Sequence, residues 1–499
     1  MPHALHNELS AILRLAGPLI AAQLAHVLMV FTDTVMMGLL GPAALAGGGL
    51  GAASYSFVSI FCVGVIAAVG NLVAIRHGAS DAAGVTRLTQ NGLWLGWGLA
   101  LLAGAALWHL EPALLYFGQL PENVTAAMQF LATLVFALPG YMSFMALRGF
   151  TAAIGRPGPV MAISIGGALA NFVLNYALIE GWFGLPQLGL AGIGLVTALV
   201  MNVMALLLAW HVLRHSAYAG YPLWRGLLRP AWRELKELLR LGLPIGGTYA
   251  VEAGLFAFAA LCMGALGSLQ LAAHQIAIMS VYVAFMVPVG LSYAVTFRIG
   301  QHFGAGRLRE ARRTGRLGIG LGAACMLGFA ALFWLAPQWV VGLFLDRRDP
   351  VYAEVTALAV ALLAIAAWFE FFDGIQTIAM GAIRGLKDAK TTFFVGLGCY
   401  WLIGAPLAWI LAFPLGWGGT RGVVGPGQRP GVRGHQPEPG FRVEVRTPAA
   451  HAAAGRRGLP PVGCAARTGA FRAKAGTGAR SAPYAAASGS VPGTDGLRD

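Results

Sequence analysis

The chain has 499 residues, of which 57% are apolar and only 11% are Asp, Glu, Lys or Arg. A soluble domain carries about 25% charged residues, so this chain lacks the polar surface needed to cover itself in water. Its five cysteines are scattered without a CxxC pair, which argues against a disulfide framework and against a cysteine zinc site. The net charge of +14 combines two unlike regions: residues 1–417 hold 22 basic and 16 acidic side chains, and residues 418–499 hold 12 and 4.

Apolar segments long enough to cross the roughly 30 Å of hydrocarbon in a bilayer recur along the first 413 residues. The first follows a short polar start and is too long for the core of a signal peptide, so we interpret it as a retained helix. We predict eleven transmembrane helices near residues 11–38, 45–75, 90–118, 125–149, 158–182, 188–213, 238–265, 270–300, 315–345, 352–382 and 391–413.

The basic residues collect in alternate connections between these segments. Twenty of the 22 lie at the start of the chain or in, or beside, the connections after the second, fourth, sixth, eighth and tenth segments. The opposite connections hold only Arg347 and Arg348. Because positive charge marks the cytoplasmic side, we predict a cytoplasmic N-terminus. We expect the chain to lie in a cytoplasmic (inner) membrane of the bacterial type.

An internal repeat is visible in the sequence. Two segments recur 226 positions later without a gap, and a third recurs 236 positions later. Six helices separate the two starts, and an even number of crossings gives the halves the same orientation, as in some secondary transporters. We expect lobes at residues 1–213 and 238–415, joined by a cytoplasmic linker at 214–237. The matched segments are Leu13–Pro18 with Leu239–Pro244, Met37–Gly41 with Met263–Gly267, and Leu147–Gly149 with Ile383–Gly385.

Three acidic residues lie well inside predicted spans: Asp33, Glu252 and Asp373. A charge at the bilayer centre costs at least about 2.5–3.5 kcal/mol, so such residues usually face a cavity and take part in function. A carboxyl group in an apolar environment can hold a proton near neutral pH and release it on wetting, which suits proton or sodium coupling. The alternative is a protonated acid that hydrogen-bonds a neighbouring helix. Glu180 and Glu370 lie nearer to predicted boundaries and are weaker candidates.

Polar residues of the fifth and sixth predicted spans could complete an oxygen-rich site with Asp33. Asn171 and Asn175 are four residues apart and therefore share one helix face. Thr197 belongs to the next span. Interhelical hydrogen bonding is the alternative for all three, and it is favoured for Thr197. Phe369 precedes Asp373 by one turn, where its ring could assist a cation, although packing or lipid contact is the commoner role of such a residue.

Taken together, these motifs resemble the multidrug and toxic compound extrusion (MATE) family, in its NorM-like branch. The resemblance covers about residues 8–415. It depends on the order and spacing of several short motifs across both halves. These are Pro18, Asp33 and Met37–Gly41 in the first half, and Pro244, Glu252, Ala273–Ile276 and Arg384–Asp388 in the second.

The resemblance implies twelve helices in two lobes, drug export, and coupling to an inward flow of Na⁺ or H⁺. It implies that Asp33, Asn171 and Asn175 match the cation site of the first lobe, and that Glu252 and Asp373 match that of the second. Phe369 falls where relatives can carry another aromatic residue. No metal is expected beyond Na⁺ at these coupling residues.

The repeat calls for a twelfth helix, but residues 416–499 are rich in Gly, Pro, Arg and Ala without a span-length apolar run. One interpretation is a disordered basic tail that touches anionic lipid or nucleic acid. The other, which we favour, is a shifted reading frame. Suitable third bases in codons 423–444, read one nucleotide later, permit an apolar segment that ends on a lysine.

The sequence therefore predicts an all-α membrane protein that exports cationic or amphiphilic small molecules by antiport. A lipid-linked saccharide flippase of related architecture is the nearest alternative, but it would be expected to line its cavity with basic residues. An enzyme is not expected, because the chain has no HExxH, no GxSxG with catalytic partners and no phosphate-binding loop. We expect a monomer in the lipid bilayer, with no cofactor and no nucleic-acid partner.

Overall fold

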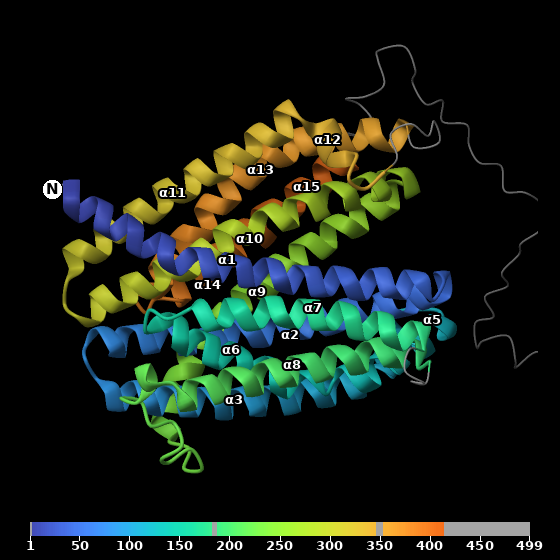
Figure 1. Cartoon of the computed structure of the whole chain (residues 1–499). Coiled ribbons are helices and arrows are strands. Elements are labelled where there is room, and N and C mark those ends of the chain that lie inside the picture. The colour runs from blue at the N-terminus through green and yellow to red at the C-terminus, as the bar shows by residue number, and fades with distance from the viewer. Residues whose placement is uncertain (1, 182–186, 346–352, 414–499) are drawn as a thin grey trace, which may run out of the picture. The chain divides into compact units, whose positions relative to one another are not determined.

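The computed structural model describes residues 2–181, 187–345 and 353–413, and all regular structure in these ranges is helical (Figure 1). Helices satisfy their backbone polar groups internally, as a chain surrounded by lipid requires. The described residues belong to one compact unit, Met1–Arg429. The helices are α1 (Pro2–Leu39), α2 (Pro42–Gly78), α3 (Ala82–Trp108), α4 (Glu111–Tyr116), α5 (Pro121–Leu134), α6 (Ala137–Ala153), α7 (Gly158–Glu180), α8 (Gly189–Arg214), η2 (Ser216–Tyr218), α9 (Trp232–Leu266), α10 (Ser268–Gly304), α11 (Leu308–Leu335), α12 (Pro337–Val341), α13 (Ala353–Gly385), α14 (Lys390–Leu397), η4 (Gly398–Gly404) and α15 (Ala405–Ala412).

Ten helices of the described chain are long and apolar enough to cross a membrane, and the bent pair α5 and α6 brings the number of spans to eleven. This result confirms the predicted all-α membrane fold. The two helices of the bent pair meet at 52°. Pro139 cannot donate a helical hydrogen bond, which breaks the helix near Val135. At the bend, Asn202 Nδ2 donates to the carbonyl oxygen of Phe136 over 2.8 Å.

Two predicted spans are shorter than expected. The segment at 90–118 ends as α3 at Trp108, before the short helix α4, and the segment at 315–345 ends as α11, before the short helix α12. Pro112 and Pro337 lie in the first turns of these short helices. Proline is favoured there because no amide hydrogen is needed, and it prevents the preceding helix from continuing.

The internal repeat is evident in the helix bounds. The second and third helices of each half begin 226 positions apart, α2 with α10 and α3 with α11, and both α2 and α10 contain 37 residues. The turn before each second helix is a glycine with positive φ, 112° at Gly41 and 141° at Gly267. Only glycine adopts such values without strain. Pro18 and Pro244 lie inside α1 and α9. The predicted parallel repeat is therefore confirmed.

The predicted division of the chain into lobes at 1–213 and 238–415 stays a prediction. In the structure, α8 ends at Arg214 and α9 begins at Trp232, so the predicted linker at 214–237 includes the start of α9. The predicted tail at 416–499 lies outside the described residues. We refer below to α1–α8 as the first repeat and to α9–α15 as the second.

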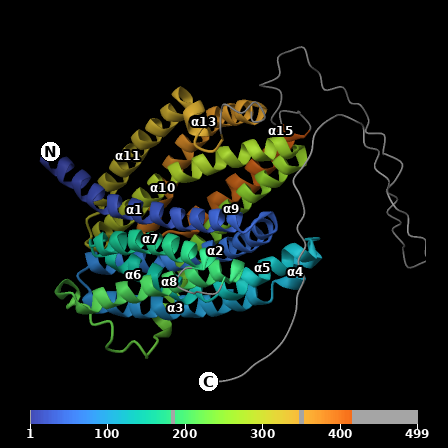
Figure 2. The same ribbon diagram turned by 45° about the vertical axis from the view of Figure 1, so that its right-hand side comes forward.

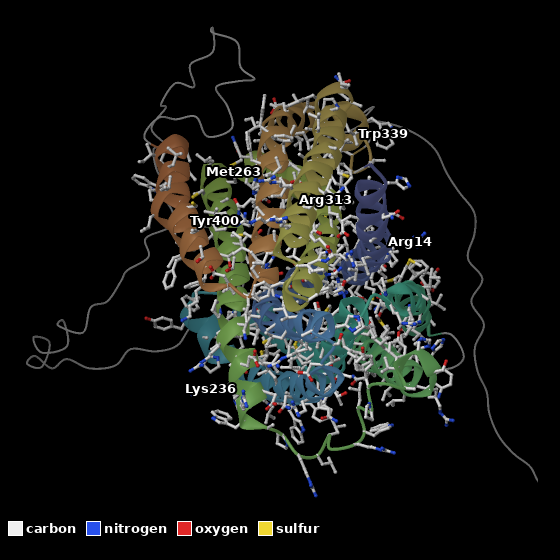
Figure 3. The ribbon with its side chains drawn as sticks, turned by 90° about the vertical axis from the view of Figure 1, so that its left-hand side faces the viewer. Arg14, Lys236, Met263, Arg313, Trp339 and Tyr400 are labelled. Atoms are coloured by element: carbon white, nitrogen blue, oxygen red, sulfur yellow. The ribbon has the colours of Figure 1, made fainter. Side chains whose placement is uncertain are left out.

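The two repeats meet along four helices, which we call the seam. Within the seam, α1 packs against α10, and α2 packs against both α9 and α10 (Figure 2). The helix α1 also packs against α7 of its own repeat. Figure 3 labels Lys236 and Met263, which lie near the two ends of α9. The seam thus joins the first two helices of each repeat.

The seam is closely packed where α2 and α10 end. A Cβ atom on Gly78 would overlap the carbonyl oxygen of Gln301, and a Cβ atom on Gly304 would overlap that of Ile75. Each residue of the first contact lies 226 positions from its counterpart in the second, so the repeat makes the same contact twice. The chain after α8 leaves the bundle at this same end (Figure 1). We call it the closed end of the seam.

Candidate functional sites

The first candidate site surrounds Asp33, near the C-terminal end of α1. Its carboxylate Oδ1 accepts hydrogen bonds from Asn171 Nδ2 at 3.2 Å and from Asn175 Nδ2 at 2.8 Å. Thr197 Oγ1 donates to Oδ2 at 2.8 Å. The structure therefore brings together all four first-repeat residues that the sequence indicated, and three donors on one carboxylate fit its ionised form.

Helix packing explains why these residues converge. The spacing of Asn171 and Asn175 places both amides on the face of α7 that packs against α1 and α8. Both asparagines are completely buried, and the Oδ1 atom of each lacks a hydrogen-bond partner. Buried polar atoms are nearly always paired, so the two unpaired oxygens are candidate partners for a bound water, cation or proton donor. Rotation of either amide would turn an acceptor oxygen toward Asp33.

The oxygen atoms of this site could bind a hard cation or accept a proton. Carboxylate, amide and hydroxyl oxygens are the ligands that hard cations prefer, and Asp33, Asn171, Asn175 and Thr197 supply all three kinds. A proton on Asp33 would equally give an unpaired amide oxygen a donor. Among the described residues, no group of three or more His, Cys, Asp and Glu side chains could hold a metal ion.

The second candidate site is a cavity of about 450 Å³ between the repeats. Glu252 of α9 and Asp373 of α13 both line it, and His26 of α1 lies in the wall contributed by the first repeat. The predicted second-lobe pair of acids therefore shares one cavity. Most of the remaining wall is apolar or aromatic, and the aromatic lining residues are Tyr141, Tyr249, Phe256, Tyr282, Phe285 and Tyr293.

Phe369 does not line this cavity. Its side chain is 43% exposed, and its ring meets Phe256 edge to face with centroids 6.1 Å apart. Phe256 is the member of the pair that faces the cavity. The structure thus gives Phe256, which the sequence did not indicate, the position from which a ring could contact a bound cation.

Two arginines that the sequence places at helix ends beside the connections turn inward in the structure. Arg148 and Arg384 are buried, and each lies 236 positions from the other in the repeat. Arg384 lines the cavity, with Nη1 donating to the hydroxyl of Tyr249 at 3.0 Å. Arg148 donates to Gln23 Oε1 at 2.6 Å, and its guanidinium lies 5.1 Å from the ring centroid of Tyr293. Hydropathy places both near helix ends, but packing turns them inward. The sequence held one sign of their shared role, which is that the two arginines occupy equivalent positions in the two repeats.

Glu370 is more deeply buried than its place near a predicted helix boundary indicated. Its side chain is completely buried within α13, and neither carboxyl oxygen has a hydrogen-bond partner. It precedes Asp373 by three residues, so the two acids lie on adjacent parts of one helix surface. By contrast, Glu180 is exposed at the end of α7. Glu370 therefore belongs with the embedded acids.

Two repeats of membrane-spanning helices around a cavity with embedded acids are the architecture of a membrane transporter. The family model of MatE matches residues 18–177 and 244–410, one segment in each repeat. The chain belongs to this family, and within it to the NorM-type multidrug efflux transporters.

Curated relatives cover most of the chain. The probable multidrug resistance protein NorM of Pseudomonas syringae pv. tomato is 71% identical over 402 residues, which are 81% of this chain and 87% of that protein. Its namesake in Pseudomonas aeruginosa is 71% identical over 411 residues, covering 82% and 84%. The multidrug resistance protein NorM of Burkholderia vietnamiensis is 39% identical over 394 residues, covering 79% and 85%.

Solved structures share the fold. The eukaryotic MATE transporter AtDTX14 superposes with a TM-score of 0.74 at 21% identity, covering 83% of this chain and 91% of that one. A multidrug resistance MATE family transporter described in an outward-facing conformation gives a TM-score of 0.72 at 20% identity, covering 81% and 88%. The family resemblance inferred from the motifs is thus confirmed.

Proposed function

We propose that the chain is an antiporter that exports cationic or amphiphilic compounds in exchange for inward Na⁺ or H⁺. The observation that carries this proposal is the Asp33 site, in which the carboxyl group accepts hydrogen bonds from three side chains while two buried amide oxygens stay unpaired. A cation or proton that binds and is released in each transport cycle could pair with these oxygens. No other cofactor is needed for the proposed cycle.

The cavity supports the proposed class of substrate. Glu252 and Asp373 supply negative charge within walls that are otherwise largely aromatic and apolar. A cation with an apolar body would place its charge near the acids and its rings against the aromatic side chains. Binding of Na⁺ or H⁺ at Asp33, or at Glu252 with Asp373, would weaken drug binding and favour the return step. Ion and drug must differ in affinity for the two conformations for such coupling to work.

A lipid-linked saccharide flippase would be expected to line its cavity with basic residues, and the embedded charges that the sequence indicates are acidic. Arg148 and Arg384 weaken that argument, since both reach the inner part of the molecule. Each guanidinium is, however, already engaged by a neighbouring side chain, Gln23 for Arg148 and Tyr249 for Arg384. The NorM relatives also favour drug export.

The decisive experiment is transport of a fluorescent organic cation into everted membrane vesicles from cells expressing the full chain. Uptake should require a sodium or proton gradient, should collapse with the matching ionophore, and should leave the cation chemically unchanged. Uptake that is driven equally well without any ion gradient would contradict antiport. Imposing the sodium and proton gradients separately distinguishes the two coupling ions.

We further propose that the chain is a monomer in the cytoplasmic membrane, with the closed end of the seam on the cytoplasmic side. The support is the excess of Lys and Arg in the connections at that end. Single cysteines at position 309 and in the 39–44 connection, in a background without native thiols, test the orientation. An impermeant maleimide should reach the second site from outside intact cells and not the first.

A further inference from the structure

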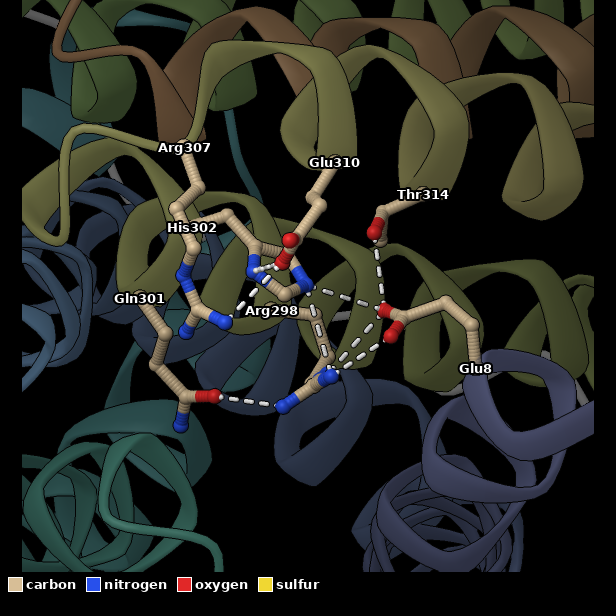
Figure 4. Close-up of polar contacts among 7 residues, drawn as sticks. All are labelled: Glu8, Arg298, Gln301, His302, Arg307, Glu310 and Thr314. Carbon is tan, nitrogen blue, oxygen red and sulfur yellow. Dashed lines mark hydrogen bonds and ion pairs between the residues drawn. The ribbon is translucent and has the colours of Figure 1, made fainter. Parts of the chain in front are cut away.

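Glu8, in the first turns of α1, is held by three side chains of the other repeat (Figure 4). Its Oε2 lies 2.6 Å from Arg298 Nη2, and its Oε1 accepts from Arg298 Nε at 3.2 Å. Thr314 Oγ1 donates to the same Oε1 at 2.8 Å, and His302 Nε2 lies 3.3 Å from it. A carboxylate and a guanidinium that meet through two atoms each form the strongest kind of ion pair in proteins.

This cluster is partly removed from water. The side chain of Glu8 is 13% exposed, that of Arg298 is 22% exposed and that of His302 is 4% exposed. The other nitrogen of His302, Nδ1, lies 3.1 Å from Glu310 Oε2, within ion-pair distance although not aligned for a hydrogen bond. Arg298 Nη1 also donates to Gln301, which in turn donates to the carbonyl of Ala153 in the first repeat. Partial burial makes these charges interact more strongly than exposed ones would.

A related cluster lies on the other side of the seam. Glu237, near the start of α9, pairs with Arg76 of α2 at 3.3 Å and with Lys387 at 2.6 Å. Arg76 occupies the position 226 residues before His302, and both face an acid on the first helix of the opposite repeat. One turn away on α9, Glu234 pairs with Arg87 of α3 at 3.2 Å. Ion pairs therefore link the two repeats at two places, and we call each of these links a charged crossing.

Both clusters lie at the closed end of the seam, beside the contacts of Gly78 with Gln301 and of Gly304 with Ile75. The cavity with Glu252 and Asp373 lies farther along the same helices. Any movement that opens the cavity toward the closed end must separate α1 from α10 and α2 from α9. The charged partners of these ion pairs would be well hydrated once separated, which makes the separation reversible.

We propose that Glu8 with Arg298, and Glu237 with Arg76, are gating residues that hold the repeats together at this end and release once in each transport cycle. This assignment rests on the alternating-access antiport proposed above. The two crossings differ in strength, because the Glu8 cluster is more buried and has more partners. Loss of Glu8 should therefore change the conformational balance more than loss of Glu237.

The test is a distance measurement that does not depend on transport. Spin labels at positions 156 and 309, both exposed at the closed end on opposite repeats, report the separation in the full chain with its five cysteines replaced. The parent should show mainly short distances. E8Q should raise the fraction of long distances about tenfold, within the usual range of conformational coupling, and E237Q should raise it less. E122Q, which neutralises an exposed acid at the opposite end, should leave the distances unchanged.

The exchanged pair E8R with R298E should restore the short distances, while each single reversal should not. Thermal unfolding of each single variant, compared with that of the parent, checks separately that it folds. Unchanged distances in both E8Q and E237Q, at native thermal stability, would overturn the gating assignment. If distances shift as expected while no variant, parent included, moves any organic cation, the gate stands and the proposed transport function fails.

Discussion

Substituting Asp33 with Asn removes the charge of the first-repeat site while keeping its shape. The amide oxygen can still accept from Asn171 and Asn175, and the amide nitrogen replaces Oδ2 opposite Thr197. Thr197 must then accept instead of donate. Alanine at position 33 would instead leave three donors unpaired, so asparagine is the substitution that separates charge from structure.

The expected cost in stability follows from the three hydrogen bonds. Bonds to a charged group contribute about 1.5–3 kcal/mol and neutral bonds about 0.5–1.5 kcal/mol, so Asp33→Asn loses about 1 kcal/mol for each bond and about 3 kcal/mol in all. The lower cost of burying a neutral group offsets part of this loss. Asp33→Ala should cost more, because each orphaned buried donor costs about 1–3 kcal/mol. Thermal unfolding in detergent, followed by tryptophan fluorescence, measures both.

Function should respond differently from stability. If Asp33 must change its occupancy in each cycle, Asp33→Asn should still bind the organic cation but lose ion-driven uptake into everted vesicles. Asp33→Glu, which moves the charge by about one methylene, should retain partial activity with a shifted pH profile. Glu180→Gln is the matched control, since it neutralises an exposed acid at the end of α7. Uptake by Asp33→Asn equal to that of the parent at matched expression would refute the reasoning.

Three further predictions concern other parts of the chain. Glu252→Gln and Asp373→Asn should each reduce ion-coupled efflux strongly while membrane insertion, assayed by fractionation, is retained; normal efflux in both would remove the second site. Gly304→Ala should disfavour the closed seam by about 1–3 kcal/mol through overpacking, seen as longer spin-label distances, whereas Gly98→Ala, where a Cβ meets open space, should not. Sequencing the gene across codons 410–450 should reveal an apolar segment in the frame shifted by one nucleotide, and third bases that forbid it would exclude the frameshift.

The sequence predicted the features that depend on spacing along one chain. Apolar length predicted the spans, and matching segments 226 positions apart predicted the repeat, because both can be read along the chain without knowledge of its packing. The Asn171 and Asn175 pair was found because residues four apart share a helix face. The meeting of that face with Asp33 was a hypothesis from polar chemistry, which the family resemblance also implied, since no pattern within one helix specifies its neighbour.

Features that depend on packing between helices could not be predicted. Arg148 and Arg384 are placed at helix ends by hydropathy, but tertiary contacts with Gln23 and Tyr249 turn them inward. Glu370 was judged by its distance from a predicted boundary, and its complete burial reflects how α13 packs against α10 and α11. Helix ends such as those beside Pro112 were missed because the apolar pattern continues past them.

The helix α1 links the candidate ion site to the closed end of the seam. Asp33 lies toward one end and Glu8 toward the other, with Pro18 inside the helix between them. Proline removes a backbone hydrogen bond and permits bending, so the two halves of α1 can tilt relative to each other. If occupancy at Asp33 changes how α1 packs against α7, a bend at Pro18 would carry that change to Glu8 and Arg298. Coupling between ion binding and opening then needs no contact between the two sites, only a helix with two stable arrangements.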